Sequence, residues 1–164
     1  HVDAFPTRPT NGGRILRFFT NIHPTRPREW ISGGTFDRLA PRYAESSGLL
    51  AEALRHDRPS AAVRLLRAVG ARRELPSAYD SFMLRFHDFL KGNAEFQAGE
   101  REHFSFPPGS SWVVLTDMVS HAVLSGQFAL EQTVILSRKS LIAPESAPIA
   151  ILEKLAGRPL AAPV

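Results

Sequence analysis

The first part of the chain carries the hydrophobic pattern of a strand between loops. The segment ILRFFTNI at 15–22 is rich in β-branched and aromatic residues, and turn-forming residues flank it at 11–13 and at Pro24. Such a segment predicts a β-strand that follows a tight turn. Alternation along this strand would place Arg17 and Asn21 on one face.

Residues 36–99 change to helical spacing. Apolar residues recur about one turn apart over 49–54 and over 63–69, and Gly70 marks the end of the second segment. A third helix is predicted over 76–92, because its apolar positions follow a period of about 3.6 residues between a Pro-Ser start and a glycine. The pattern therefore predicts three helices in this region.

The strand pattern returns over 100–136. Short apolar segments are separated by the turn-forming sequences PPG and SGQ. Beyond them, residues 137–164 are looser, with one helix expected over 148–155 and an end rich in proline and alanine. We expect strands over 103–106, 112–115, 121–124 and 128–136.

Strands on both sides of a helical insertion predict an α+β fold with a mainly β core. The best match is a double-stranded β-helix, or jelly roll, formed by 1–35 and 100–136, with 36–99 as the insertion and 137–164 as a carboxy-terminal tail. We interpret 1–164 as a single domain. The chain starts without methionine, on a candidate metal ligand, so we expect a fragment whose amino-terminal part is missing.

The composition limits the metal ligands and the binding partners that are possible for this chain. With 43% hydrophobic residues in 164, the chain can bury a core, and it has no apolar run long enough to span a bilayer. The absence of cysteine leaves only His, Asp and Glu as metal ligands. The net charge of +4 favours anionic partners, but scattered arginines without an aromatic-basic module argue against nucleic acid.

The candidate chemistry is a metal site formed by His1, Asp3 and His121. A His-x-Asp sequence places both side chains on one face of a strand, and His121 follows an apolar strand introduced by Pro-Gly and precedes a glycine turn. Two imidazoles and one carboxylate can hold iron(II) and leave positions open for oxygen and a chelating co-substrate. Spacing alone leaves the alternative open that His1 is a frayed terminus and His121 an ordinary half-buried histidine.

Several segments resemble the bacterial Kdo (3-deoxy-D-manno-oct-2-ulosonic acid) 3-hydroxylases, which are iron(II)/2-oxoglutarate-dependent oxygenases. They are NGGRILRFFTNIHP at 11–24, YDSFMLRFHD at 79–88, FPPGSSW at 106–112 continuing through SGQFALEQT at 125–133, and LEKLAGRPL at 152–160. The resemblance implies a metal-binding oxidoreductase with His1, Asp3 and His121 as the iron ligands.

The same resemblance implies 2-oxoglutarate and O2 as co-substrates, with ascorbate in a supporting role. The expected reaction is hydroxylation of position 3 of Kdo in the lipopolysaccharide inner core, on Kdo-lipid A. The resemblance also implies that the enzyme lies in the cytoplasm, in peripheral contact with the inner membrane. The rival functions are a 2-oxoglutarate hydroxylase for another substrate and a non-catalytic cupin-like binding domain.

The distal carboxylate of 2-oxoglutarate needs a cationic anchor, for which arginine is well suited. Many oxygenases of this superfamily carry it on the strand after the second histidine, but Phe128–Leu136 contains neither Arg nor Lys. We therefore favour Arg17, assisted by Asn21 and by Gln132 in an inward position. Arg14 is the rival, on the opposite face of the strand. The alternative for Arg17 is a surface arginine on an edge strand.

Overall fold

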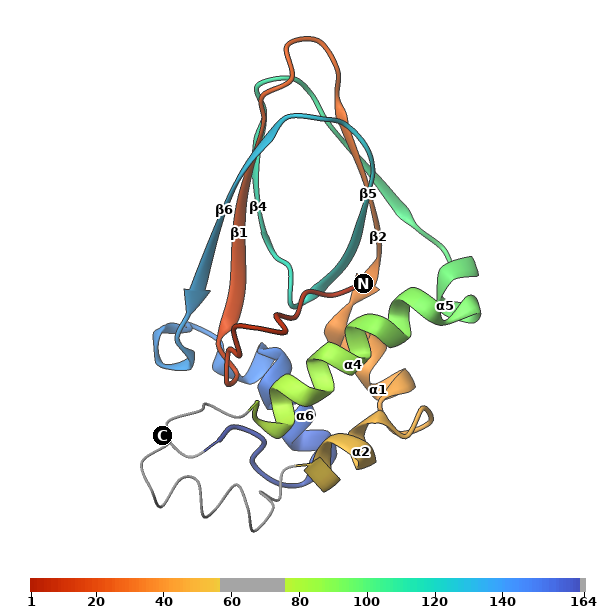
Figure 1. The fold of residues 1–164 in the computed structure, drawn as a ribbon, viewed down its shortest axis with the longest axis vertical. Coiled ribbons are helices and arrows are strands. Elements are labelled where there is room, and N and C mark those ends of the chain that lie inside the picture. The colour runs from red at the N-terminus through yellow and green to blue at the C-terminus, as the bar shows by residue number, and fades with distance from the viewer. Residues whose placement is uncertain (57–75, 163–164) are drawn as a thin grey trace.

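The computed structural model describes residues 1–56 and 76–162, which form two facing antiparallel sheets with helices below them (Figure 1). The sheet orders are β4-β1-β6 and β3-β2-β5. The sequence pattern predicts all of these strands except β2. Their bounds are β1 Arg14–Asn21, β2 Arg28–Thr35, β3 Glu102–Phe106, β4 Ser111–Leu115, β5 Val119–Ser125 and β6 Ala129–Leu136.

The chain changes sheet at the connections β1–β2, β3–β4, β4–β5 and β5–β6. The inner faces of the two sheets meet through aromatic rings. Phe19 of one sheet lies 4.9 Å from Trp30 of the other, measured between ring centroids, and Trp30 lies 5.6 Å from Trp112. Phe106 stacks on Trp112 at 3.8 Å. These contacts give the space between the sheets an apolar, aromatic lining.

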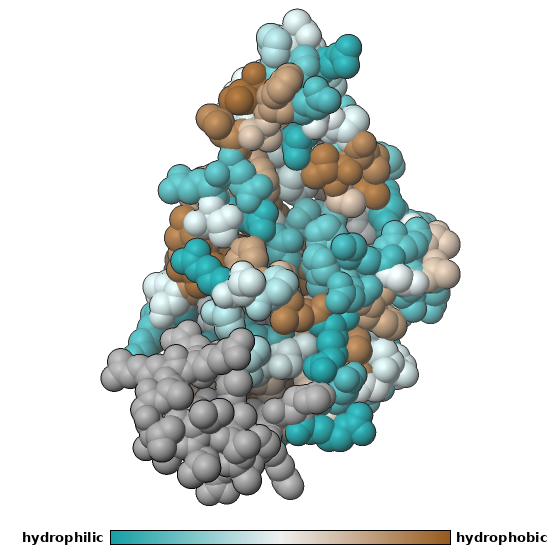
Figure 2. All heavy atoms as spheres, in the orientation of Figure 1, coloured by the Kyte–Doolittle hydropathy of each residue, from teal (hydrophilic) through white to brown (hydrophobic). Residues whose placement is uncertain are grey.

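The outer faces of the strands are also apolar. Figure 2 shows hydrophobic patches on the part of the surface that the strands form. Among the described residues, the exposed large hydrophobic side chains on or beside strands are Phe18, Ile22, Val113, Leu124, Phe128 and Leu130, together with Phe104 and Val123, which pair with the inward-facing Trp30 and so lie on the inner face. Because both faces carry apolar side chains, the sequence pattern alone does not tell the inner face from the outer one.

The helices gather at one end of the sheets (Figure 1). The predicted helices over 49–54, 76–92 and 148–155 correspond to α2, α4 and α6, whereas the one predicted over 63–69 lies outside the described residues. None of the described helices is both long and apolar enough to cross a membrane. The bounds are α1 Phe36–Tyr43, α2 Leu49–His56, α4 Ala78–Gly92, α5 Ala94–Ala98 and α6 Pro148–Ala156, with 3-10 turns η1 Arg138–Ser140 and η2 Pro144–Ser146.

Helix α4 connects the helical layer to the start of the chain. Ser77 and Asp80 form a capping box, in which each side chain accepts a hydrogen bond from the other residue's backbone N–H. The buried face of α4 includes Phe82 and Phe86, which belong to the same hydrophobic core as the fully buried Val2. This packing anchors the segment on which two of the candidate metal ligands lie.

An ion pair ties the end of β6 to α6 and gives a pH-dependent prediction. Arg138 donates two hydrogen bonds to the Glu153 carboxylate, which also accepts one from the Leu160 N–H. Burial opposes ionisation of Glu153, but these donors outweigh it and hold its pKa below the ordinary 4.5. The resulting stabilisation is present at neutral pH and is lost as the pH falls through the lowered pKa.

Glu153→Gln is therefore expected to lower the free energy of unfolding at neutral pH by about 0.5 kcal/mol, since Arg138 is well exposed. The measurement is urea unfolding of the wild-type protein and the variant at about pH 7 and about pH 3. The difference should shrink at the lower pH, and a difference of the same size at both would contradict the assignment.

Candidate metal centre

His1 and His121 face each other because their backbones form an antiparallel pair. The His121 N–H donates to the His1 carbonyl at 2.8 Å, and the His1 nitrogen donates back to the His121 carbonyl at 3.3 Å. Residues that exchange two such bonds carry their side chains on the same side. Two residues on, the Asp3 N–H donates to the Thr116 carbonyl at 2.7 Å, which draws Asp3 toward the β4–β5 turn.

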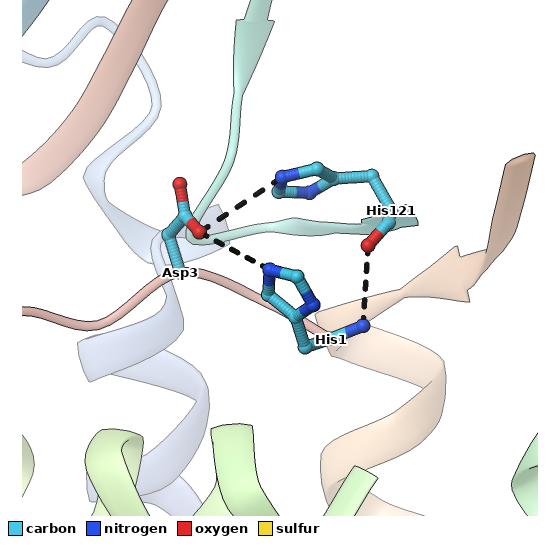
Figure 3. Close-up of side chains that lie close together, drawn as sticks. All are labelled: His1, Asp3 and His121. Atoms are coloured by element: carbon cyan, nitrogen blue, oxygen red, sulfur yellow. Dashed lines mark hydrogen bonds and ion pairs between the residues drawn. The ribbon is translucent and has the colours of Figure 1, made fainter. Parts of the chain in front are cut away.

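The three predicted ligands converge on one point (Figure 3). The Asp3 Oδ1 lies 3.6 Å from the His1 Nε2 and 3.9 Å from the His121 Nε2, and one ligand atom from each residue lies within 4.8 Å of the others. With ligand bonds of about 2 Å, donors on one face of an octahedral ion lie roughly 3 Å apart. The donor set fits a divalent ion with shifts of under about 1 Å.

The ring of His121 is held with its Nε2 free to act as a ligand. Its Nδ1 lies 2.9 Å from the Val119 carbonyl, which can only accept, so Nδ1 carries the proton and Nε2 the lone pair. Trp30 stacks on the imidazole with ring centroids 5.2 Å apart. Burial lowers the pKa of His121, partly offset by the Val119 carbonyl and Asp3, and the neutral ring is the form that binds metals.

Asp3 is held as a carboxylate. Burial is the largest single influence and opposes its charge, but the hydrogen bond from His1 and the charges of His121 and Arg17 together lower its pKa. Arg17 Nε lies 3.0 Å from the Asp3 Oδ2. An ionised Asp3 beside a neutral His121 supplies the mixed donor set that iron(II) prefers in oxygenases.

His87 supports the site, although the sequence pattern favours a surface or capping role for it. Its Nδ1 lies 2.7 Å from the Val2 carbonyl and therefore donates to it, and its ring lies 4.4 Å from that of His1. Helical spacing could have indicated that His87 faces the interior, because it lies four residues after the buried Met83 and so shares its face of α4. His87 thereby fixes the backbone between the two ligands of the His-x-Asp pair.

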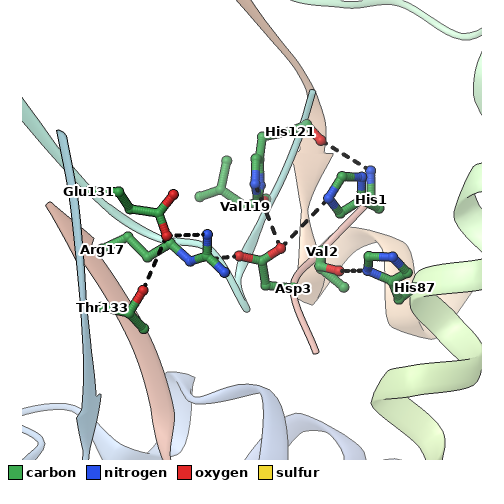
Figure 4. A network of polar contacts seen from close by, with 9 residues as sticks. All are labelled: His1, Val2, Asp3, Arg17, His87, Val119, His121, Glu131 and Thr133. Atoms are coloured by element: carbon green, nitrogen blue, oxygen red, sulfur yellow. Dashed lines mark hydrogen bonds and ion pairs between the residues drawn. The ribbon is translucent and has the colours of Figure 1, made fainter. Parts of the chain in front are cut away.

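Arg17 lies on the inner face of β1, beside the candidate ligands (Figure 4). Besides Asp3, it contacts Glu131, whose Oε1 accepts a hydrogen bond from the Arg17 Nη1 at 2.7 Å. Glu131 was not among the candidate residues. The strand register could have identified it, because it pairs Phe19 with Glu131 and Arg17 with Thr133, so that both residues of β6 face inward.

The inward position expected for Gln132 is wrong. Gln132 pairs with Phe18, which points outward and is 42% exposed, and Gln132 is itself exposed. Side chains that lie directly opposite each other in an antiparallel pair share a face. In the middle of β6 the inner positions Glu131 and Thr133 are polar whereas the outer Leu130 is apolar, which inverts the usual alternation there.

Asn21 and Arg14 have other partners. Asn21 shares the inner face with Arg17 as expected, but at the far end of β1, roughly 13 Å along the strand. Its amide donates to the carbonyls of Arg26 and Phe106 and is fully buried. The Arg14 Nε donates to the buried Asp117 carboxylate at 2.6 Å. The structure therefore does not bring either side chain to the cluster of His1, Asp3 and His121.

Comparison with known proteins identifies the family. The family model of 3-deoxy-D-manno-oct-2-ulosonic acid (Kdo) hydroxylase matches residues 1–159. A search of curated proteins gives no significant match. The resemblance noted in the sequence is thus confirmed by a match over nearly the whole chain.

The chain is also similar to solved structures of the Kdo hydroxylase KdoO, described as a non-heme Fe(II) alpha-ketoglutarate dependent dioxygenase. The complex with alpha-ketoglutarate and Fe(III) is 39% identical with a TM-score of 0.77, over 98% of this chain and 53% of that one. The complex with succinate and Fe(III) is 38% identical with a TM-score of 0.78, over 100% and 54%. The chain spans about half the length of these relatives. It belongs to the Kdo hydroxylase family.

Proposed function

We propose that this chain holds the iron centre of a 2-oxoglutarate-dependent dioxygenase that hydroxylates position 3 of Kdo in the lipopolysaccharide inner core. The observation that carries the proposal is the convergence of His1, Asp3 and His121 in a member of this family. KdoO, which is similar over the whole chain, has been seen with Fe(III) and succinate and with cobalt(II).

The residues of this chain would position the metal and keep water away from it. His1, Asp3 and His121 would hold the iron on one face, and Val119, Trp30 and the α4 histidine His87 keep the ligands in place. When bound, iron(II) would supply the activation of O2 that is coupled to decarboxylation of 2-oxoglutarate to succinate. The aromatic lining between the sheets, in which Trp30 stacks on His121, would limit access of water from that side.

Arg17 is the proposed anchor for the distal carboxylate of 2-oxoglutarate. It faces inward beside Asp3, and its present partner Glu131 has a side chain that is 43% exposed. A solvated carboxylate can turn away into water, which would free the Arg17 fork for two hydrogen bonds to the co-substrate. Asn21 and Gln132, which were expected to assist, and the rival Arg14 have less support because they lie elsewhere.

Arg17→Ala in the full-length protein is expected to weaken 2-oxoglutarate binding by on the order of 2–5 kcal/mol, because a buried charged contact is lost. The affinity can be measured by titration of the iron-loaded protein without oxygen. Arg138→Ala is the matched control and should leave the affinity unchanged, since Arg138 pairs with Glu153 at the protein surface. Equal losses in both variants would contradict the role of Arg17.

The fold and location are part of the proposal. Four changes of sheet along the chain and two facing antiparallel sheets support a double-stranded β-helix with a helical insertion, within a single oxygenase domain.

The net charge of +4 favours peripheral contact with an anionic lipid surface. From membership of the Kdo hydroxylase family we infer that the enzyme acts on Kdo-lipid A at the cytoplasmic face of the inner membrane.

A substrate panel tests this function. Full-length protein with iron(II), ascorbate and 2-oxoglutarate is offered Kdo-lipid A precursor, the same precursor without Kdo, a peptide mixture and nucleosides. Succinate formation should rise only with the Kdo-bearing acceptor. If another acceptor stimulates succinate formation, the protein is an oxygenase with a different substrate. If no acceptor gives oxygen-dependent succinate, a binding domain is favoured.

A further inference from the structure

A second feature adjoins the candidate metal centre on the side of the helices. A pocket of about 270 Å³ is lined by His1 and His121 together with Lys91, Gln97 and Arg101. The volume is near the lower end of small-molecule sites. None of the described residues that line it is acidic. The pocket therefore joins two candidate metal ligands to two cations.

The two cations have no carboxylate partner among the described residues. Lys91 lies on α4, one turn beyond His87, and forms no ion pair in the part of the chain that the structure describes. The Arg101 guanidinium donates to the carbonyls of Phe96, Gly99 and Glu100 and lies over the Phe96 ring. These three bonds leave two of its five N–H donors. Carbonyl groups orient the guanidinium without neutralising its charge.

The backbone of β2 makes room for this arginine. A Cβ atom on Gly33 would lie 2.8 Å from the Arg101 Nη1 and 3.0 Å from the Phe96 ring. Real Cβ atoms do not approach other atoms that closely, so a side chain at Gly33 would displace the guanidinium or the ring. The placement of Arg101 thus depends on a glycine at this position of β2.

We propose that this pocket binds the carboxylate of the acceptor sugar acid, with Lys91 and Arg101 as the residues that determine specificity. The inference rests on the proposed function. Two cations beside the metal would fix a carboxylate at a set distance from the carbon to be oxidised. A larger groove of about 980 Å³ shares Gly33, Phe96 and Arg101 with the pocket and gives room for the rest of a large acceptor.

The other carboxylate in the reaction belongs to 2-oxoglutarate. The pocket lining includes neither Asp3 nor Arg17, which form the other side of the candidate centre. An acceptor in the pocket and a co-substrate that reaches Arg17 would therefore approach the metal from different sides. This separation allows the two carboxylates to be distinguished by mutation.

The test compares Lys91→Ala, Arg101→Ala and their combination with the wild-type full-length protein. The KM for Kdo-lipid A precursor should rise about ten-fold or more for each single variant, as for a lost hydrogen bond to a charged group, while the KM for 2-oxoglutarate stays constant. Calorimetry of metal-free protein with free Kdo and with its methyl ester gives a second readout. The variants should weaken binding of Kdo and leave that of the ester unchanged.

Two further variants separate charge from structure. Lys139→Ala removes one exposed positive charge outside the pocket lining and should change neither KM. Gly33→Ala keeps every charge but displaces Arg101, so it should reproduce part of the Arg101→Ala effect. Circular dichroism of each variant verifies folding.

The inference is overturned if the wild-type enzyme hydroxylates Kdo and the Lys91 and Arg101 variants do so with an unchanged KM. It is also overturned if these variants weaken 2-oxoglutarate binding instead, since the pocket would then hold the co-substrate. A wild-type enzyme that leaves Kdo unmodified contradicts the proposed function. In that case the calorimetry still decides whether the pocket binds the carboxylate.

Discussion

Replacing His121 with alanine is expected to abolish iron(II) binding and every oxygen-dependent reaction of the full-length protein. His121 supplies one of three converging donors, and its ring is fixed by Val119 and Trp30. Loss of an outer-sphere partner alone lowers metal affinity by about 10- to 100-fold, so loss of a ligand should exceed 100-fold. The measurement is a titration with iron(II) in the absence of oxygen.

His103→Ala is the matched control for this experiment. His103 is an exposed histidine on β3 and lies outside the converging group. The control should bind iron(II) as the wild-type protein does. An iron affinity of His121→Ala within ten-fold of the wild-type value would contradict the assignment of the ligands.

Asp117→Ala is expected to destabilise the protein by about 3–5 kcal/mol, because it leaves the buried Arg14 guanidinium without its partner. Asp117 is fully buried and Arg14 is 4% exposed. Burial raises the pKa of Asp117 despite the hydrogen bond and the charge of Arg14, so the pair itself adds little net stability. The protein is destabilised when only one partner is removed, because the other charge is then buried without a partner.

A double-mutant cycle measures this coupling. Urea unfolding is followed for Asp117→Ala, Arg14→Met and the protein with both changes. The double variant should be less destabilised than the sum of the single variants, because no charge is left unpaired. Strict additivity, or a loss of less than about 1 kcal/mol in Asp117→Ala, would show that Arg14 does not depend on Asp117.

Local pattern predicts most of the elements because local forces determine them. The capping sequence before α4 and the proline and glycine around α6 define helix ends without long-range information. Strand β2, with the sequence REWISGGT, is not predicted, because its two glycines and mixed polarity give no alternation of apolar and polar residues. Tertiary pairing with β3 and β5 makes it a strand.

The inward face of β6 could not be predicted from polarity. Strands usually bury their apolar side chains, but here Leu130 and Gln132 point outward while Glu131 and Thr133 point inward. Only the register with β1 reveals this inversion. The inner polar residues are those that contact Arg17 or each other, which fits a site that must hold charged groups.

The convergence of the ligands is a long-range property. His1 and His121 are separated by 120 positions, and no spacing rule relates them. The His-x-Asp sequence specifies one half of the site, because residues two apart share a face. The third ligand, His121, is predicted from the family resemblance, since an isolated histidine in a strand does not by itself indicate a metal site.

The most direct test of the central claim follows the oxygen atom. Full-length protein is incubated with iron(II), 2-oxoglutarate, Kdo-lipid A precursor and isotopically labelled O2, and the product is analysed by mass spectrometry. We expect one labelled oxygen atom on Kdo for each succinate formed, and no product from the His121→Ala protein. Oxygen in the product that comes from water, or labelled Kdo formed by His121→Ala, would contradict an oxygenase centred on His1, Asp3 and His121.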